Sequence, residues 1–172
     1  MANSLGILTG GGDCPGLNAV IRAVVRRADG AGWQAVGVRE GWRGLVEPIF
    51  EDLGPAQVSG ILPRGGTIIG TSRTNPFKLE AVEQVLQNFR DRELDALVAI
   101  GGEDTLGVAA RLYAEHELPV VGDPNVPHLP DAVGVDLELD LQTGVVSLGL
   151  ERPGADAVRA GPRCADGGVP AV

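Results

Sequence analysis

Two glycine-rich segments of this chain have the residue types and spacing of loops that bind phosphate. The first is Thr9–Gly16, between the apolar run Leu5–Leu8 and a helical pattern that begins at Leu17. The second is Gly101–Thr105, which follows the apolar run Ala96–Ile100. A glycine turn before a helix presents backbone N–H groups and lets an anion approach the chain closely. Two such loops in one sheet indicate a cleft for phosphate transfer.

A sheet with covering helices is needed to hold these loops, and residues 1–122 alternate strand and helix patterns. The strand patterns are Leu5–Leu8, Ala35–Val38, Ala96–Ile100 and Pro119–Val121, and the helix patterns are Leu17–Ala28, Lys78–Arg92 and Thr105–His116. This alternation predicts an α/β fold of three layers, with helices on both faces of a mostly parallel sheet. Ligands of such sheets lie beyond the carboxyl ends of the strands, where both glycine loops fall.

Residues 123–172 differ in composition, since they hold no aromatic residue and six of the 12 prolines. Alternating apolar and polar residues, a turn at Thr143-Gly144 and an apolar return predict a β-hairpin within residues 133–150. Proline, glycine, alanine and charge dominate residues 151–172, which we expect to be disordered. We therefore expect a division into residues 1–122 and a separate tail, 123–172.

The charge and cysteine content exclude several classes of function. A net charge of −9 argues against nucleic acid or an anionic membrane as a partner. All of the 14 basic residues except Lys78 are arginine, so a phosphate clamp would use guanidinium groups and backbone amides. The two cysteines, Cys14 and Cys164, do not suggest a structural disulfide, and no apolar run has the length of a membrane span. We expect a cytoplasmic protein.

Three motifs, in order along the chain, resemble the bacterial 6-phosphofructokinase family. They are Gly6–Arg22, Arg64–Arg73 and Ala99–Thr105, and the resemblance covers residues 4–122, the leading part of a family chain. The resemblance implies a partial phosphofructokinase domain. It also implies phosphoryl transfer to the 1-hydroxyl of fructose 6-phosphate in glycolysis, Mg²⁺ as cofactor, pyrophosphate or ATP as donor, and the homotetramer usual in the family.

Individual roles follow from the same resemblance. Arg73 would contact the donor phosphates and stabilise charge during transfer, and Glu103 takes the place of an acidic residue associated with Mg²⁺. The residues expected to bind the phosphoryl donor are Gly11, Arg73, Gly102, Asp104 and Thr105.

Asp104 bears on the identity of the donor. In the family, ATP users usually have glycine at this position, whereas pyrophosphate users usually have aspartate. The physics agrees, because an aspartate side chain occupies space and repels the additional phosphate of a nucleotide. We expect pyrophosphate as the donor, with ATP as the alternative.

The family pattern is expected to stop after Gly122. Members continue with Val-Pro-Lys-Thr-Ile-Asp-Asn-Asp, whereas residues 123–130 read Asp-Pro-Asn-Val-Pro-His-Leu-Pro. His128 thus stands where the resemblance implies the catalytic aspartate, the base that takes the sugar hydroxyl proton. Its proline-rich surroundings favour a surface loop, and a lost base costs about 10²–10⁴-fold in rate. We expect a truncated or frameshifted chain, inactive by itself.

Two other functions fit the same residues. The loops would serve a module that binds pyrophosphate or a nucleotide without turnover, or another small-molecule kinase with a Gly-Gly-acid-Asp-Thr loop. The first loop and Arg64–Arg73 count against the second of these. A structural explanation for Glu103 and Asp104 also exists, because acidic side chains complement the dipole at a helix N-terminus.

Overall fold

The computed structural model describes residues 3–12, 16–122, 137–140 and 145–148. The elements, in chain order, are β1 (Ser4–Gly10), α1 (Leu17–Gly30), β2 (Gln34–Val38), α2 (Arg43–Val46), β3 (Phe50–Leu53), α3 (Val82–Asp91), β4 (Ala96–Gly101), α4 (Glu103–His116), β5 (Val120–Gly122), β6 (Leu137–Asp140) and β7 (Val145–Leu148). None of the helices in these ranges is long and apolar enough to span a bilayer.

Five strands form one sheet in the order β3-β2-β1-β4-β5. Strand β1 is parallel to both β2 and β4, and β5 continues the parallel part beside β4. Strand β3 alone runs antiparallel, against β2. The predicted mostly parallel sheet is confirmed.

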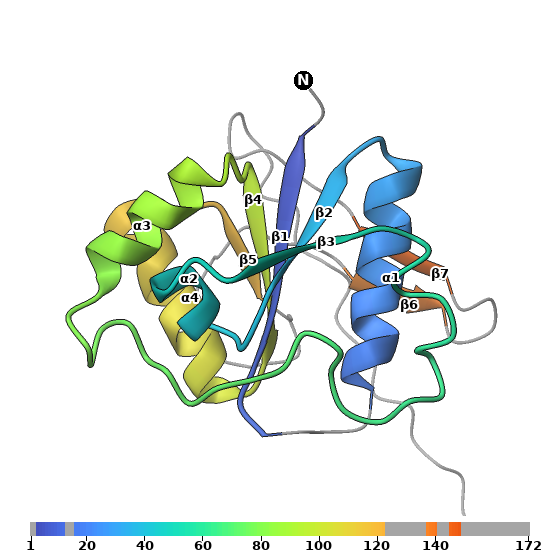
Figure 1. The fold of residues 1–172 in the computed structure, drawn as a ribbon, viewed down its shortest axis with the longest axis horizontal. Helices are drawn as coiled ribbons and strands as arrows, with labels where there is room; N and C mark the ends of the chain where they lie inside the picture. The colour runs from blue at the N-terminus through green and yellow to red at the C-terminus, as the bar shows by residue number, and fades with distance from the viewer. Residues whose placement is uncertain (1–2, 13–15, 123–136, 141–144, 149–172) are drawn as a thin grey trace, which may run out of the picture.

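Two hydrophobic cores lie on opposite faces of this sheet (Figure 1). In β1, Leu8 belongs to one core, while Leu5 and Ile7 belong to the other, as expected when successive side chains point to opposite faces. Helix α1 covers the face of Leu5, and helices α2, α3 and α4 cover the face of Leu8. The predicted three-layer α/β fold is therefore confirmed.

The helices begin close to the predicted positions, with one clear shift. Helix α1 begins at Leu17, after Gly16 with φ 107°. Helix α3 begins at Val82 rather than Lys78, because Glu80 has φ 53° and left-handed backbone cannot continue a right-handed helix. Helix α4 begins at Glu103, ahead of the predicted Thr105.

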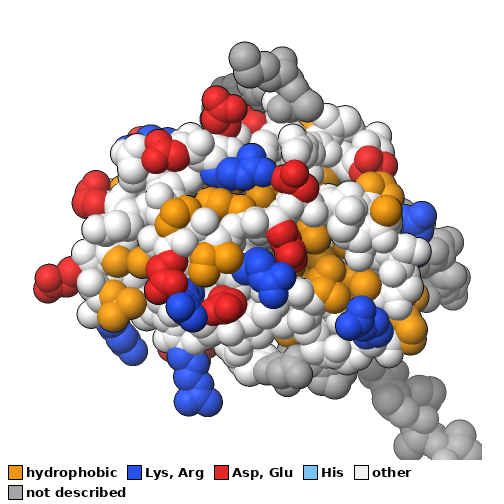
Figure 2. All heavy atoms as spheres, in the orientation of Figure 1, with side chains coloured by type: hydrophobic (Ala, Val, Ile, Leu, Met, Phe, Trp, Pro, Cys, Tyr) orange, Lys and Arg blue, Asp and Glu red, His pale blue; other side chains and the backbone are white. Residues whose placement is uncertain are grey.

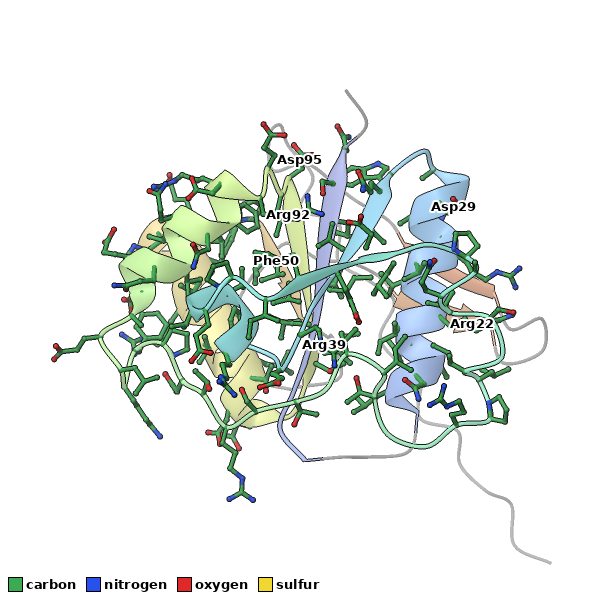
Figure 3. All side chains as sticks on the ribbon, viewed as in Figure 1. Arg22, Asp29, Arg39, Phe50, Arg92 and Asp95 are labelled. Atoms are coloured by element: carbon green, nitrogen blue, oxygen red, sulfur yellow. The ribbon has the colours of Figure 1, made fainter. Side chains whose placement is uncertain are left out.

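Strand β3 and the short helix α2 were not predicted from the sequence. Strand β3 carries two adjacent acidic residues, which hide the apolar alternation typical of a strand. Two arginines outside β3 pair with these residues: Arg39 lies 2.9 Å from Glu51, and Arg92 lies 2.7 Å from Asp52. Figure 3 labels both arginines, which follow the ends of β2 and α3.

Strands β6 and β7 form a separate antiparallel pair, in which Leu137 faces Leu148 and Asp140 faces Val145. The pair lies beside α1 (Figure 1). Both strands fall within the range 133–150 for which a hairpin is expected. The turn at 141–144 and the segment 151–172, expected to be disordered, lie outside the described residues.

Candidate phosphate-binding site

The two glycine loops leave the sheet side by side. Strands β1 and β4 are parallel neighbours, and their last residues, Gly10 and Gly101, are paired in register. A Cβ atom on Gly101 would stand 2.5 Å from the backbone oxygen of Gly10, so the strand ends approach this closely only because a side chain is absent. Both loops therefore start at one point on the carboxyl edge of the sheet, as predicted.

Thr105 lies between the two loops. Its side chain is 3% exposed, and its hydroxyl oxygen lies 2.9 Å from the position a Cβ of Gly101 would take. A Cβ on Gly11 would stand 3.7 Å from the backbone nitrogen of Gly102 and 4.0 Å from the Thr105 hydroxyl. The structure thus brings Gly11, Gly102 and Thr105 together, with Thr105 packed beneath the loops.

The N-terminus of helix α4 lies next to Gly11 of the first loop. Gly102 is the N-cap residue and provides no side-chain cap, so the first N–H groups of the helix are open to an anion. Glu103 and Asp104 form the first turn, and both are exposed. Their carboxylates complement the helix dipole and are also free to meet a cation that accompanies a phosphate.

The segment Arg64–Arg73 packs against the end of β1 and the first loop. The hydroxyl of Thr71 donates a hydrogen bond of 2.7 Å to the backbone oxygen of Gly11, and the hydroxyl of Thr9 donates one of 2.9 Å to Gly70. Arg73 follows two residues after Thr71. Its side chain is exposed, and no ion pair of Arg73 occurs within the described part of the chain.

Asn18 anchors the beginning of the same segment. It is 2% exposed in the first turn of α1. Its amide nitrogen donates to the backbone oxygens of Arg64 at 3.0 Å and Gly65 at 3.3 Å, and its amide oxygen accepts from the N–H of Ile68 at 2.8 Å. No role for Asn18 or Thr71 follows from the sequence patterns alone. The available signal for Asn18 was a polar residue on the apolar face of a helix.

Some expected site residues are not described. His128 and the centre of the first loop, residues 13–15, lie outside the described ranges. Within those ranges there is no group of three or more His, Cys, Asp or Glu side chains arranged to hold a metal. Because Mg²⁺ is usually held by one or two carboxylates together with substrate phosphates, this finding leaves the role of Glu103 as a prediction.

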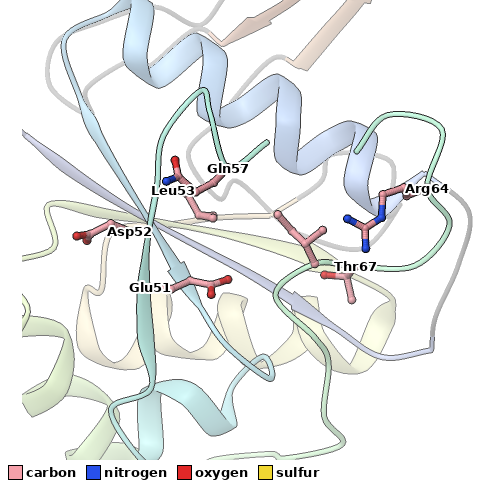
Figure 4. Close-up of a pocket in the computed structure, with 7 residues that line it drawn as sticks. Glu51, Asp52, Leu53, Gln57, Arg64 and Thr67 are labelled. Carbon is pink, nitrogen blue, oxygen red and sulfur yellow. The ribbon is translucent and has the colours of Figure 1, made fainter. Parts of the chain in front are cut away.

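A hollow of about 440 Å³ lies between β3 and the segment of Arg64 and Thr67, and no described residue of the glycine loops lines it (Figure 4). It is lined by Glu51, Asp52, Leu53, Gln57, Arg64, Thr67 and Ile68. Arg64 and Glu51 approach it from different segments, so it carries both signs of charge. The surface around β3 and α1 likewise mixes both signs (Figure 2). This hollow lacks the surplus of donors that a phosphate needs.

Among the described residues, pKa shifts occur at two exposed ion pairs. The hydrogen bond from Arg111 lowers the pKa of Glu115, and a hydrogen bond with Glu47 raises the pKa of Arg43. Both pairs join residues four apart on a helix or at its end. Pairs of this kind stabilise the surface of a helix.

Sequence comparison identifies relatives for most of the described chain. The family model described as Phosphofructokinase matches residues 4–128. A pyrophosphate–fructose 6-phosphate 1-phosphotransferase of Amycolatopsis methanolica is 57% identical over 122 residues, or 70% of this chain and 36% of the relative. A protein of the same name from Streptomyces coelicolor is 46% identical over 151 residues, or 86% of this chain and 44% of the relative. An ATP-dependent 6-phosphofructokinase of Aquifex aeolicus is 46% identical over 121 residues, or 70% of this chain and 38% of the relative.

The chain spans less than half the length of these curated relatives. The matches also reach past Gly122. The family match ends at residue 128, and the alignment with the Streptomyces coelicolor protein covers 151 residues.

Solved structures give the same result for the fold. The T-state phosphofructokinase of Pichia pastoris superposes with a TM-score of 0.63 at 35% identity, over 67% of this chain and 14% of that one. A pyrophosphate-dependent phosphofructokinase of Marinobacter aquaeolei has a TM-score of 0.58 at 17% identity, over 70% of this chain and 32% of that one. The second likeness concerns the fold alone.

Proposed function

Because the chain belongs to the phosphofructokinase family, we propose that it carries the phosphoryl-donor site of an enzyme that phosphorylates the 1-hydroxyl of fructose 6-phosphate in glycolysis. The observation that supports this most directly is the convergence of three segments at one sheet edge. The loop after β1, the N-terminus of α4 and the segment ending at Arg73 meet around Gly11. This arrangement supplies backbone donors and one exposed cation, Arg73.

These groups suit phosphoryl transfer, in which positioning and charge stabilisation do most of the work. Backbone N–H groups of the first loop and of α4 would hold the donor phosphates. Arg73 is exposed and unpaired by any described residue, so its guanidinium is available for the transferring group. A bidentate guanidinium matches phosphate geometry better than a lysine would.

Magnesium is the cofactor that these residues would accommodate. Glu103 and Asp104 expose two carboxylates in the first turn of α4, beside the loops, and Mg²⁺ needs only one or two carboxylates plus phosphate oxygens. When bound, the ion would neutralise charge on the donor phosphates. Glu103 is the residue we assign to orient it.

Pyrophosphate is the donor we favour, and ATP is the second candidate. Asp104 is exposed beside Gly102, so an additional phosphate or a sugar would meet both its bulk and its negative charge. Several of the similar proteins are named as pyrophosphate users, and others as ATP users. The argument therefore rests on Asp104 rather than on the names.

We also propose that this chain alone binds the donor without transferring it at a useful rate. By family resemblance His128 stands at the position of the base, and phosphoryl transfer to a sugar hydroxyl loses about 10²–10⁴-fold without one. A binding module without turnover is thus the second candidate function. The cytoplasmic location and the homotetramer of the family belong to the proposal as well.

Two measurements on the purified chain test the proposal. Thermal unfolding is followed with Mg²⁺ and either pyrophosphate or ATP, and fructose 1,6-bisphosphate formation is assayed under the same conditions. We expect pyrophosphate to raise the midpoint, since a ligand of the folded state stabilises it, with little or no product. Arg73→Gln should reduce this stabilisation, whereas Arg90→Gln, on the exposed face of α3, should leave it unchanged. Absence of stabilisation by both donors would refute the donor site.

A further inference from the structure

One side-chain hydrogen bond joins the first glycine loop to the segment that ends at Arg73. The hydroxyl of Thr71 donates to the backbone oxygen of Gly11 over 2.7 Å, across 60 positions of sequence. Gly11 has φ 88°, a conformation that residues other than glycine rarely adopt. Gly12 follows it, is exposed, and would find no atom within 4 Å of an added Cβ. The Gly11–Gly12 peptide is thus held on one side and open on the other.

The geometry of the peptide bond determines what faces the open side. In a trans peptide the C=O and the following N–H point in opposite directions, and no cis peptide occurs among the described residues. Because the oxygen of Gly11 is directed to Thr71, the N–H of Gly12 is directed away from Thr71. An anion at the open side therefore meets a donor. If this peptide were flipped, the anion would meet the partial negative charge of a carbonyl oxygen.

The same hydrogen bond connects two separate parts of the site. Thr71 lies two residues before Arg73, and the hydrogen bond from Thr9 to Gly70 holds the adjoining backbone against β1. The first loop and the backbone that carries Arg73 are consequently held in one relative position. A phosphate between them requires both to be in place.

We propose that Thr71 is a positioning residue, which orients the Gly11–Gly12 peptide toward the phosphates of the donor. The proposal rests on the proposed function, because it requires a phosphate at this loop. In this role Thr71 does not touch the donor. It acts through the direction of the Gly12 N–H and through the placement of Arg73.

The test compares Thr71→Val with Thr71→Ser and with Thr67→Val as a matched control. Valine keeps the shape of threonine and removes the hydroxyl, whereas serine keeps the hydroxyl. Thr67 is another threonine of the same segment, and its hydroxyl contacts the hydroxyl of Thr9 at 2.9 Å and the N–H of Ile69 at 3.3 Å instead of Gly11. The dissociation constant of inorganic pyrophosphate with Mg²⁺ is measured by calorimetry. Thermal unfolding without ligand is measured on the same samples.

We expect Thr71→Val to weaken pyrophosphate binding about three- to tenfold, the effect of one neutral hydrogen bond. Thr71→Ser should restore the affinity of the unsubstituted chain, and Thr67→Val should alter the unfolding midpoint without altering the affinity. The carbonyl ¹³C shift of Gly11, recorded without ligand, should move in Thr71→Val, return in Thr71→Ser and stay in place in Thr67→Val.

Three results would overturn the inference. If Thr71→Val binds pyrophosphate as tightly as the unsubstituted chain, the peptide needs no positioning by Thr71, while the proposed function stands. If Thr71→Val lowers the unfolding midpoint and leaves the affinity unchanged, the hydrogen bond is structural only. If the unsubstituted chain binds no pyrophosphate, the proposed function fails and the role of Thr71 in donor binding fails with it. The Gly11 carbonyl shift then still reports the hydrogen bond. Thr71→Ala takes the place of the valine variant if that variant does not fold.

Discussion

The side chain of Thr105 fills the space that Gly10 leaves open by having no Cβ. A Cβ added to Gly10 would stand 2.9 Å from Cγ2 of Thr105, and Thr105 is 3% exposed. The first turn of α4 therefore rests directly on the last residue of β1. This contact joins the two glycine loops into one structure, because the first loop begins at the end of β1 and the second leads into α4.

Gly10→Ala should destabilise the fold by about 1–3 kcal/mol, the usual cost of adding an atom to a packed site. Urea unfolding measures the change. Gly12→Ala is the control, since an added Cβ there meets nothing within 4 Å. Combining Gly10→Ala with Thr105→Ala should recover part of the loss, because the clashing atoms are removed. Equal stability of Gly10→Ala and Gly12→Ala would contradict the described contact.

Asn18→Ala should cost about 1–3 kcal/mol, since it leaves the N–H of Ile68 without its partner. The substitution should lower the stability of the segment 64–68 as well as that of the whole fold. Amide hydrogen exchange should accelerate in residues 64–68, which the Asn18 side chain holds. The exposed Asn3 provides a control, and Asn3→Ala should change neither quantity. Unchanged exchange in Asn18→Ala would show that other contacts hold the segment.

Substitutions at Asp104 separate the size of its side chain from its charge. Asp104→Asn keeps the size and removes the charge, whereas Asp104→Gly removes both. Like charges about 4 Å apart in water repel by about 1 kcal/mol, so removing the charge should improve ATP binding roughly fivefold relative to pyrophosphate. Asp104→Gly should improve it further by providing space. Titration of each variant with both donors gives the ratio of the dissociation constants for ATP and pyrophosphate. If this ratio is unchanged in both variants, Asp104 does not determine the choice of donor.

The surface pair on α4 predicts a dependence of stability on pH. Arg111 donates hydrogen bonds to Glu115 at 2.9 and 3.3 Å, and this lowers the pKa of Glu115. A lowered pKa in the folded state means that the stabilisation is present above the usual glutamate range and is lost as the pH falls through the folded pKa. Glu115→Gln should therefore reduce stability slightly at neutral pH and not in acid. The difference should shrink in high salt, because the pair is exposed.

Arg111 also lies over the ring of Phe77, 3.7 Å from its centroid. This contact should contribute about 0.5–1 kcal/mol and should withstand salt better than the pair with Glu115. A double-mutant cycle with Arg111→Gln and Phe77→Leu measures the coupling. A coupling energy near zero would show that the ring and the guanidinium are neighbours without mutual attraction.

The sequence predicted those parts of the fold that local patterns determine. The buried run Ala96–Ile100 and the glycines at the ends of β1 and β4 sufficed to place the sheet and both loops. Strand β3 was not predicted because Glu51 and Asp52 interrupt its apolar pattern, and their partners, Arg39 and Arg92, stand 12 and 40 positions away in the sequence. The start of α3 depended on the left-handed backbone of Glu80, which composition does not reveal.

In the site, too, local motifs predicted some residues, whereas contacts between distant segments were not predicted. Gly11, Gly102 and Thr105 were expected from their motifs, and the structure places them together. The bonds from Thr71 to Gly11 and from Asn18 to Arg64 join segments 60 and 46 positions apart, so they arise only when the chain is folded. Roles in donor or metal binding remain predictions for the three residues placed together and for Arg73, Glu103 and Asp104.

We propose that the two glycine loops together form one site for the donor phosphates. The most direct test is an NMR titration of the ¹⁵N-labelled chain with pyrophosphate and Mg²⁺, following the amides of Gly11, Gly12, Gly102 and Glu103. These amides should shift together with a single dissociation constant, while amides of α3 should not move. Shifts confined to the hollow beside Arg64, or no shift in either loop, would contradict it.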